Sequence, residues 1–272
     1  MTEFVHLLDK MIKEFSNINS EMSFVIGKEW YEDTRNNIKK CLITSHLTRK
    51  AVATAIQTEV DLIITIAPPI FVINKEKRIP AEKLEILRLL IENRIAIFSF
   101  GEKFLTMEKG GFDYFLNLID FKYSSLFNYN LTNFCNTATS LEGRIGETEK
   151  KAKFKDLIEK VQKNLDVPIT YYGYEDTLVK KIVILSEILQ EELFFELATK
   201  TDIDAIIVGD LGYEAKVSVH LAKIPIIIVG RENLENNSLS KIRRMLMEYI
   251  TVDLPELETL KQQFQGTLYP KK

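Results

Sequence analysis

Three acidic residues in the second half of the chain, Asp210, Glu214 and Glu235, have types and spacing that could support chemistry. Together their carboxylates could hold a hard cation such as Mg²⁺ or Ca²⁺ through oxygen ligands. A structural interpretation competes with this one and is the one we expect. Asp210 would cap the helix that follows it, and Glu214 would lie in the first turn of that helix, where the helix dipole stabilises acidic side chains.

The histidines are weaker candidates for a functional site than these acidic residues, because they are scattered singly along the chain: His6, His46 and His220. A lone histidine is more often a surface residue or a satisfied core residue than a metal ligand. His46 is the one to follow, since it comes soon after an apolar segment, residues 40–44, that is typical of a strand.

The segment LIITIAPPIF, residues 62–71, combines a position suited to function with side chains that can do no chemistry. Its β-branched and aliphatic residues predict a buried strand, and Pro68 and Pro69 end it because proline lacks the amide that a sheet requires. In α/β sheets, ligands usually bind beside the carboxyl ends of the strands. Yet Ile66 and Ala67, which stand there, supply no acid, base, nucleophile or metal ligand.

The composition is that of a globular protein of 272 residues, 46% hydrophobic and 28% charged. The net charge of -3 and the isoelectric point of about 5.8 give no overall reason to bind nucleic acid, although local basic patches could do so. Cys41 and Cys135 do not suggest a disulfide framework, so we expect the cytosol. The first residues are unlike a targeting peptide, and no apolar run reaches the roughly 20 residues of a membrane span.

Strand-like and helical segments alternate along the chain, which predicts an α/β protein with mainly parallel sheets. Apolar runs typical of strands occur at residues 40–44, 61–66, 94–100, 167–172, 180–185, 204–210 and 224–230. Helical patterns occur at residues 50–56, 82–92, 151–165, 187–200, 212–222 and 238–250. The irregular stretch 121–148 is the best candidate for a junction between domains. We therefore expect two similar α/β domains, 1–121 and 122–251, and a C-terminal tail, 252–272.

Five motifs stand in order along the chain: VDLIITIAPPIF (60–71), RIAIFSF (94–100) with Gly110-Gly111 after it, GRIGE (143–147), DAIIVGDLGYE (204–214) and GRENLE (230–235). In this order they resemble the motifs of the Nif-three-like family, also called GTP cyclohydrolase I type 2 homologs. The resemblance covers about residues 38–250. It implies two α/β units with mainly parallel sheets that face each other across a cleft.

The resemblance also implies where two metal ions would be bound, and that most of their ligands are missing in this chain. The family's ligand positions fall on or near six residues: Ile66, Ala67, Gly101, Leu105, Arg231 and Glu235. Only Glu235 keeps a ligand type. A further family histidine corresponds to Glu214, and the stretch Asn19-Ser20-Glu21 stands where the family has Trp-Asp-Asn.

A dinuclear centre holds its ions about 3.5–4 Å apart with several imidazole and carboxylate ligands, which one carboxylate cannot replace. Arg231 would in addition place a fixed positive charge where a cation was bound, and such a charge favours an anion. We therefore expect no metal and no other cofactor. Candidate residues for an anion site in the cleft are Arg231, His46, Asp210 and Glu214.

The GRIGE motif allows two interpretations that the sequence leaves open. It could be a substrate loop. Alternatively, Gly143 and Gly146 could form a tight turn in which Arg144 pairs with Glu147 for structural reasons.

Basic segments at residues 149–155 and 241–244 and the end of the chain are candidate partner surfaces, although helices often display such charges only to remain solvated. The last residues, 264–272, mix aromatic and basic side chains without a core pattern, which suits a disordered tail or a segment that orders on a partner. The candidate partner-binding residues are Lys241, Arg243, Arg244, Phe264, Tyr269, Lys271 and Lys272.

A well-patterned core without the chemistry of its relatives indicates a binding or regulatory protein that has lost its metal site. The first partner to consider is the translation machinery, with the protein associated with the ribosome in dormancy or translational silencing. A transcriptional regulator is the second, and a homo-oligomer is a further option. The alternative is a metal-dependent hydrolase of the GTP cyclohydrolase I type 2 class with a rearranged site formed by Asp210, Glu214, Glu235 and His46.

Overall fold

The computed structural model describes residues 3–31, 37–69, 79–131, 139–219, 224–249 and 256–261. The chain divides into two compact units. Unit 1 comprises Met1–Phe104 and Leu239–Lys272, and unit 2 comprises Leu105–Ser238. The division thus falls earlier than residue 121, at which we expected the first domain to end. The chain returns to unit 1 within helix α9 (Arg231–Tyr249).

Unit 1 contains a five-stranded sheet in the order β1-β4-β3-β2-β11, in which every pair is parallel except β1 with β4. Its strands are β1 (Ser23–Ile26), β2 (Lys40–Thr44), β3 (Leu62–Thr65), β4 (Ala96–Ser99) and β11 (Glu256–Leu260). Its helices are α1 (Glu3–Phe15), the short 3-10 helix η1 (Lys28–Tyr31), α2 (Arg49–Gln57) and α3 (Ala81–Glu92), and α4 (Lys103–Thr106) crosses the boundary to unit 2.

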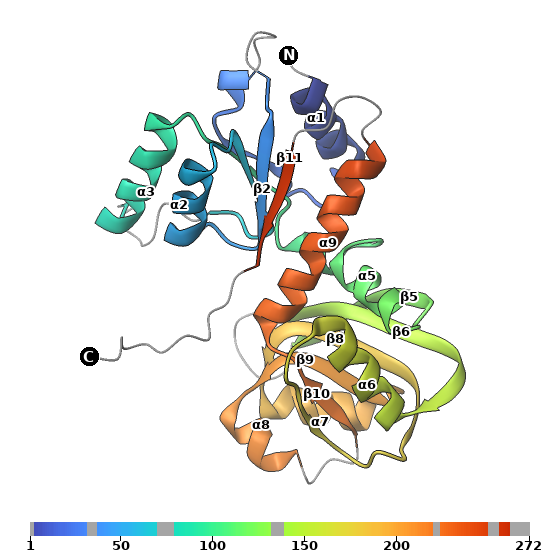
Figure 1. Cartoon of the computed structure of the whole chain (residues 1–272). Helices are drawn as coiled ribbons and strands as arrows, with labels where there is room; N and C mark the ends of the chain where they lie inside the picture. The colour runs from blue at the N-terminus through green and yellow to red at the C-terminus, as the bar shows by residue number, and fades with distance from the viewer. Residues whose placement is uncertain are drawn as a thin grey trace. The chain divides into compact units, whose positions relative to one another are not determined.

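Helices α2 and α3 cover one face of this sheet, and α1 lies on the other side of it (Figure 1). Alternate strand residues face α2 and α3, because Leu42, Ile63 and Ile97 join one cluster with Val52 and Leu90 of the two helices. Burial of this apolar surface is the main stabilising contribution to the sheet and helix packing of unit 1.

The strand β11 lies inside the segment that we expected to be a tail. It pairs in parallel with β2, and Lys40 forms a 2.9 Å ion pair with Glu258 across the two strands. Leu260 packs against the cluster under α2 and α3. Residues 256–260 are therefore part of the sheet, and the weak apolar pattern of this segment reflects its place at the sheet edge.

Unit 2 contains a six-stranded sheet in the order β5-β6-β8-β9-β10-β7. Its strands are β5 (Tyr123–Leu131), β6 (Thr139–Lys153), β7 (Thr170–Tyr172), β8 (Leu178–Leu189), β9 (Ala205–Leu211) and β10 (Ile226–Ile228). Its helices are α5 (Gly111–Leu118), α6 (Phe154–Leu165), α7 (Glu191–Lys200) and α8 (Tyr213–Ser218), together with the start of α9. Within the described residues, none of the helices of either unit is long and apolar enough to cross a membrane.

The two α/β units are confirmed, but the sheet of unit 2 is mixed rather than mainly parallel. Only β8, β9 and β10 run parallel, whereas β5, β6 and β7 pair antiparallel. The stretch 121–148, which we expected to be an irregular junction, forms most of the long hairpin of β5 and β6. Ser124, Ser125 and Asn128 of β5 are exposed while Phe127 is buried.

Three helix boundaries also differ from the sequence patterns. Residues 151–153, expected in a helix, finish β6, and residues 187–189, expected in the next helix, finish β8. Conversely, α9 begins at Arg231 rather than at residue 238. A segment with charged residues at a strand end can be helix or strand. Pairing with a neighbouring strand therefore decides where the strand ends and the helix begins.

The same aspartate interaction fixes the parallel strand pairs at the centre of both sheets. In unit 1, Asp61 Oδ2 accepts hydrogen bonds from the backbone N–H groups of Lys39 (2.7 Å) and Lys40 (3.0 Å) at the start of β2. In unit 2, Asp204 Oδ2 accepts from the N–H groups of Lys180 and Lys181, both at 2.9 Å, in β8. The N–H groups of the two aspartates donate in return to the Lys40 and Lys181 carbonyls at 2.9 and 2.8 Å.

The correspondence extends to the opposite ends of the strands. Gly101 after β4 and Gly230 after β10 have φ angles of 79° and 81°, in the left-handed region that glycine adopts without strain. Each glycine carbonyl accepts from the N–H three residues later, that of Phe104 or Asn233, at 3.1 and 3.2 Å. The segments DLIITI (61–66) and DAIIVGD (204–210), each of which begins with an aspartate before an apolar strand, therefore make equivalent hydrogen bonds in the two units.

We expect Asp61→Ala and Asp204→Ala each to lower the free energy of unfolding by about 2 kcal/mol, because each leaves two strand N–H groups without their charged acceptor. Urea unfolding followed by circular dichroism measures the loss. Asp202→Ala is the matched control, since Asp202 pairs only at the surface with Lys181 (2.6 Å) and should change stability by less than about 1 kcal/mol. Equal effects of Asp202→Ala and Asp204→Ala would contradict the assignment.

Candidate functional site

The residues that follow β3 are buried and bonded through their backbone. The N–H groups of Ile66 and Ala67 both donate to the carbonyl of Ser45, at 3.2 and 3.0 Å. Their side chains are 1% and 7% exposed. The end of β3 is therefore held against the end of β2 by the main chain, whatever side chains stand at these two positions.

The residues after β4 are held by side chains from the segment between α1 and β1. Asn19 Nδ2 donates to the Phe100 carbonyl at 2.6 Å, and Glu21 Oε2 accepts from the Lys103 N–H at 3.1 Å. A Cβ atom at Gly101 would collide with the Glu21 side chain. Position 101 therefore cannot take a larger residue unless Glu21 moves.

Three buried hydroxyl residues lie side by side at the ends of the strands, since Thr44 pairs in register with Thr65 and Thr65 with Ser99. Thr44 Oγ1 donates to the His46 carbonyl at 3.4 Å, and Ser99 Oγ donates to the Ile66 carbonyl at 3.1 Å. These bonds tie the loops after β2 and β3 to the sheet. The Thr65 hydroxyl has no hydrogen-bond partner among the residues that the structure describes.

A pocket of about 270 Å³ opens above these strand ends within unit 1, and we call it the strand-end pocket. Its lining residues come from the loops after β2, β3 and β4 and from α3: His46, Leu47, Ala67, Pro68, Pro69, Lys83, Ile86 and Glu102. His46 and Lys83 are half-buried, whereas Glu102 is exposed. The pocket combines an apolar wall with three side chains that can bind a polar group.

The sequence pointed to part of this pocket and missed the rest. His46 was singled out because it stands close after a strand, and the same reasoning applied to Glu102, which follows the end of β4, would have found it. Lys83 carried no such signal, since it lies on α3. The sequence indicated that the end of β3 is a position suited to a ligand. The residues that follow this strand end line the pocket: Ala67, Pro68 and Pro69.

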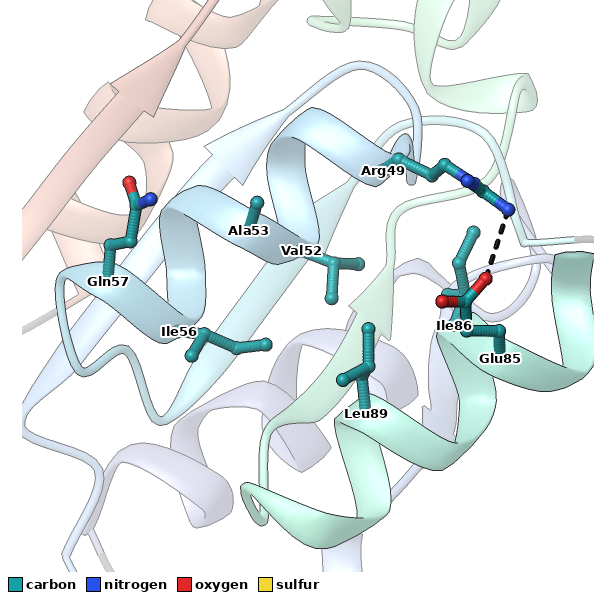
Figure 2. A pocket seen from close by; sticks show the side chains of 8 residues that line it. All are labelled: Arg49, Val52, Ala53, Ile56, Gln57, Glu85, Ile86 and Leu89. Carbon is teal, nitrogen blue, oxygen red and sulfur yellow. Dashed lines mark hydrogen bonds and ion pairs between the residues drawn. The ribbon is translucent and has the colours of Figure 1, made fainter.

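A second hollow of about 300 Å³ lies between α2 and α3. Figure 2 shows Val52 and Ile56 of α2 facing Ile86 and Leu89 of α3. The Arg49 guanidinium and the Glu85 carboxylate form an ion pair of 3.0 Å at one end (Figure 2). Apart from this pair the walls are mainly aliphatic, so this groove offers contact area and no group for chemistry.

In unit 2, an ion pair stands at the two positions to which the resemblance assigned the last ligands. Arg231 Nε donates to Glu235 Oε1 at 2.8 Å across one turn of α9. The Glu235 side chain is 2% exposed and that of Arg231 is 37% exposed. Leu105, the remaining position in this unit, is buried and apolar. The positive charge next to the Glu235 carboxylate is thus a guanidinium of the protein itself.

The two other acidic candidates lie in different surroundings. Asp210 pairs with Lys216 at 2.9 Å and accepts from the Leu211 N–H at 2.8 Å, while Glu214 is exposed in the first turn of α8. The helix cap is Gly212 rather than Asp210, so the expected capping role of Asp210 was wrong. Over the described ranges, no group of three or more His, Cys, Asp or Glu residues is arranged to hold a metal ion.

The residues present do not fit the two metal ions that the resemblance implies. Isoleucine, alanine, glycine and leucine carry no ligand atom in their side chains, and arginine is a cation that does not ligate metal. Position 101 is in addition closed by Glu21.

The GRIGE motif has a structural role, but a different one from the pair that we expected. Arg144 Nε and Nη2 donate to the two Asp113 carboxylate oxygens at 2.6 and 2.9 Å, and both side chains are almost fully buried. Glu147 pairs instead with Lys180, at 2.8 Å. The motif lies within β6 and forms no tight turn. The signal for Asp113 was an aspartate inside the apolar run GGFDYF.

The basic candidates differ in their surroundings. Lys241 is half-buried on α9, whereas Arg243 and Arg244 are exposed on the same helix. Phe264, Tyr269, Lys271 and Lys272 lie outside the described residues, as do His220 and Cys135.

Comparisons with known proteins identify relatives along nearly the whole chain. The family model Duf34/NIF3 (NGG1p interacting factor 3) matches residues 19–263. The "GTP cyclohydrolase 1 type 2 homolog" of Clostridium acetobutylicum is 24% identical over 237 residues, covering 82% of this chain and 85% of the relative. The protein of the same name from Clostridium perfringens is 24% identical over 253 residues, covering 89% and 94%.

Solved structures share the fold at lower identity. Staphylococcus aureus protein SA1388 is 14% identical with a TM-score of 0.71, covering 99% of each chain. Reduced HcgD from Methanocaldococcus jannaschii is 18% identical with a TM-score of 0.69, covering 94% of this chain and 98% of its own. At these identities the likeness establishes the two-unit α/β fold and nothing about ligands.

We expect Arg144→Ala to lower the free energy of unfolding by about 3–5 kcal/mol, because it leaves the Asp113 carboxylate buried without its counter-ion. Urea unfolding measures this, and Lys180→Ala is the control. That substitution breaks the more exposed pair with Glu147 and should lower stability by less than about 1 kcal/mol. The assignment of Arg144 as a structural residue would be contradicted if Arg144→Ala were as stable as Lys180→Ala.

Proposed function

The chain belongs to the Duf34/NIF3 family, and within it we propose that this protein is a non-catalytic binding protein without a dinuclear metal centre. The observation that carries the proposal is the ion pair between Arg231 and Glu235. The family resemblance assigns both positions to metal ligands. In this chain Arg231 supplies a cation, and this cation already neutralises the Glu235 carboxylate.

A metal ion at Glu235 would have to displace the guanidinium or stay beside it. Displacement would break the Arg231–Glu235 ion pair, so the ion would have to compete with a charged partner that already contacts the buried carboxylate. If the ion stayed beside the guanidinium, a divalent cation and Arg231 would repel each other in a poorly hydrated place. Neither arrangement favours metal binding, so Glu235 supports the packing of α9 rather than catalysis.

The strand ends of unit 1 support the same proposal. Ile66 and Ala67 present only alkyl groups, and their burial shows that these side chains complete the core. The Asn19 and Glu21 bonds occupy the space at Gly101. These positions therefore have a packing role that accounts for the residues present.

The printed names of relatives supply the competing function. Two clostridial relatives are called GTP cyclohydrolase 1 type 2 homologs, and a hydrolase of that class would require a rearranged site. His46 belongs to unit 1, while Asp210, Glu214 and Glu235 belong to unit 2, where Asp210 and Glu235 pair with Lys216 and Arg231. The family description, NGG1p interacting factor 3, names an interaction with a protein, which agrees better with a binding role.

For the partner, we propose a protein or ribonucleoprotein assembly, with the ribosome as the first to test and a transcriptional regulator as the second. Support comes from Arg243 and Arg244, which are exposed on consecutive positions of α9 and can contact phosphates or acidic side chains. The net charge of -3 means that such contact would be local, not general.

We expect protein that has been incubated with Zn²⁺, Mn²⁺ or Fe²⁺ and then desalted to retain far less than one ion per chain by elemental analysis. A dinuclear centre would retain about two. Glu235→Gln should leave the metal content unchanged and lower the thermal midpoint, since it removes the partner of Arg231. Retention of about two ions per chain, lost in Glu235→Gln, would establish the hydrolase-type site instead.

We expect the full-length protein to co-sediment with ribosomes in lysate of its native cells at low salt and to leave that fraction at high salt, because phosphate contacts weaken as counter-ions compete. The double variant Arg243→Ala, Arg244→Ala should leave it at lower salt than the wild type. Arg88→Ala, an exposed arginine of α3, is the control for general loss of charge. Absence of the wild-type protein from the ribosome fraction at low salt would exclude this partner.

A further inference from the structure

We propose that the outer edge of β5 pairs with β5 of a second copy of this chain, as two antiparallel strands related by a two-fold axis. Strand β5 (Tyr123–Leu131) stands at one end of the unit 2 sheet, where it pairs with β6. Its other edge pairs with no strand that the structure describes. The backbone groups along the edge of a sheet are a template on which a further strand can pair.

The other edge strands that the structure describes have features that hinder such pairing. Strand β7 has three residues, β1 has four and an irregular register with β4, and β11 carries two acidic residues, Glu256 and Glu258. Short length, irregular pairing and charged side chains are common means by which edge strands avoid other chains. Strand β5 has none of these features, since it has nine residues, a continuous register with β6 and no charged residue or proline.

The middle of β5 is open to solvent. Ser124, Ser125 and Asn128 are exposed, and Leu126 between them is 50% exposed. Phe127 points instead into the hydrophobic core of unit 2, which fixes the strand in the sheet. An interface along this edge would therefore remove the Leu126 side chain from water, and burial of its apolar surface would stabilise the interface.

The choice of a second copy as the partner follows from the order of residues in β5, which is complementary to itself in one register. A two-fold axis perpendicular to a sheet keeps each side chain on its own face, so the residue on the axis lies opposite its own copy. With the axis at Leu126, the two exposed leucines face each other, and Ser124 of each chain lies opposite Asn128 of the other. Directly opposite side chains on one face are the pairs that stabilise antiparallel strands.

Neighbouring registers are less favourable, because an axis at Ser125 or Phe127 would place Leu126 opposite Ser124 or Asn128. In the register at Leu126 no like charges meet, since β5 is uncharged. The absence of charge also gives the edge no group with which to select a charged peptide of another protein. One strand pair buries less area than the roughly 1,200–2,000 Å² of stable interfaces, so we expect a dimer that dissociates on dilution.

Sedimentation velocity of the full-length protein from about 1 to 200 µM measures the monomer–dimer equilibrium. We expect Leu126→Lys to weaken dimerisation about tenfold or more, because it places two lysines opposite each other at the axis. Leu178→Lys is the matched control, since Leu178 is 52% exposed but belongs to the inner strand β8. It should dimerise like the wild type, and the thermal midpoint reports that each variant is folded.

Disulfide cross-linking tests the register. Cys41 is buried, and Cys135, which lies outside the described residues, is replaced by serine in these variants. Leu126→Cys should join two chains under mild oxidation, because opposite residues of antiparallel strands have Cα atoms about 4.5–5.5 Å apart. Asn128→Cys should cross-link far less, because position 128 of the second copy would lie about 14 Å away along the strands.

A wild-type protein that stays monomeric over this concentration range, or a Leu126→Lys variant that dimerises like the wild type, would overturn the proposal. Cross-linking of Asn128→Cys as efficient as that of Leu126→Cys would overturn the register. Both measurements use the purified protein alone. They are therefore separate from the metal content, which depends on Glu235, and from the ribosome fraction, which depends on Arg243 and Arg244.

Discussion

Both sheets depend on an aspartate that begins one parallel strand and accepts two consecutive N–H groups from its neighbour. Parallel strands have no hairpin turn to fix their register. A slip of one residue in that register would move every core side chain to the other face of the sheet. Asp61 and Asp204 prevent that slip in unit 1 and unit 2 through bonds of 2.7–3.0 Å. Because the starts of the strands are fixed, their carboxyl ends fall in fixed positions too.

The strand ends are then completed by the main chain and by hydroxyl groups. In unit 1, the Ser45 carbonyl accepts two N–H groups, and Ser99 bonds both the Ile66 carbonyl and, as acceptor, the Gly101 N–H. None of these bonds uses the side chains of Ile66 or Ala67. The loops around the strand-end pocket are thus held in place by a scaffold that is independent of the chemistry presented on it.

The sequence predicted the parallel centre of both sheets, because buried runs such as residues 62–65 and 205–211 are apolar on both faces and are bounded by an aspartate and by proline or glycine. It failed for β5, β6 and β11, whose polar residues on the outer side conceal the strand pattern, so that only pairing with a neighbour identifies them. The site was predictable where it follows a strand end, as for His46. Asp113 had a signal in its place inside an apolar run, but its partner Arg144 is 31 residues away. Lys83 had no signal, because it lies on a helix rather than after a strand.

Because the scaffold is separate from the chemistry presented on it, a fold of this family can keep its core when the side chains at its strand ends differ. A metal centre needs every ligand, whereas the hydrogen bonds at the strand ends need only the backbone and the hydroxyl groups of Thr44 and Ser99. Ile66 and Ala67 add apolar burial to a framework that does not depend on their side chains. In unit 2, Arg231 keeps the Glu235 carboxylate neutralised inside the protein. The two units thus carry different side chains near their strand ends, apolar residues in one and an internal ion pair in the other, on the same kind of backbone framework.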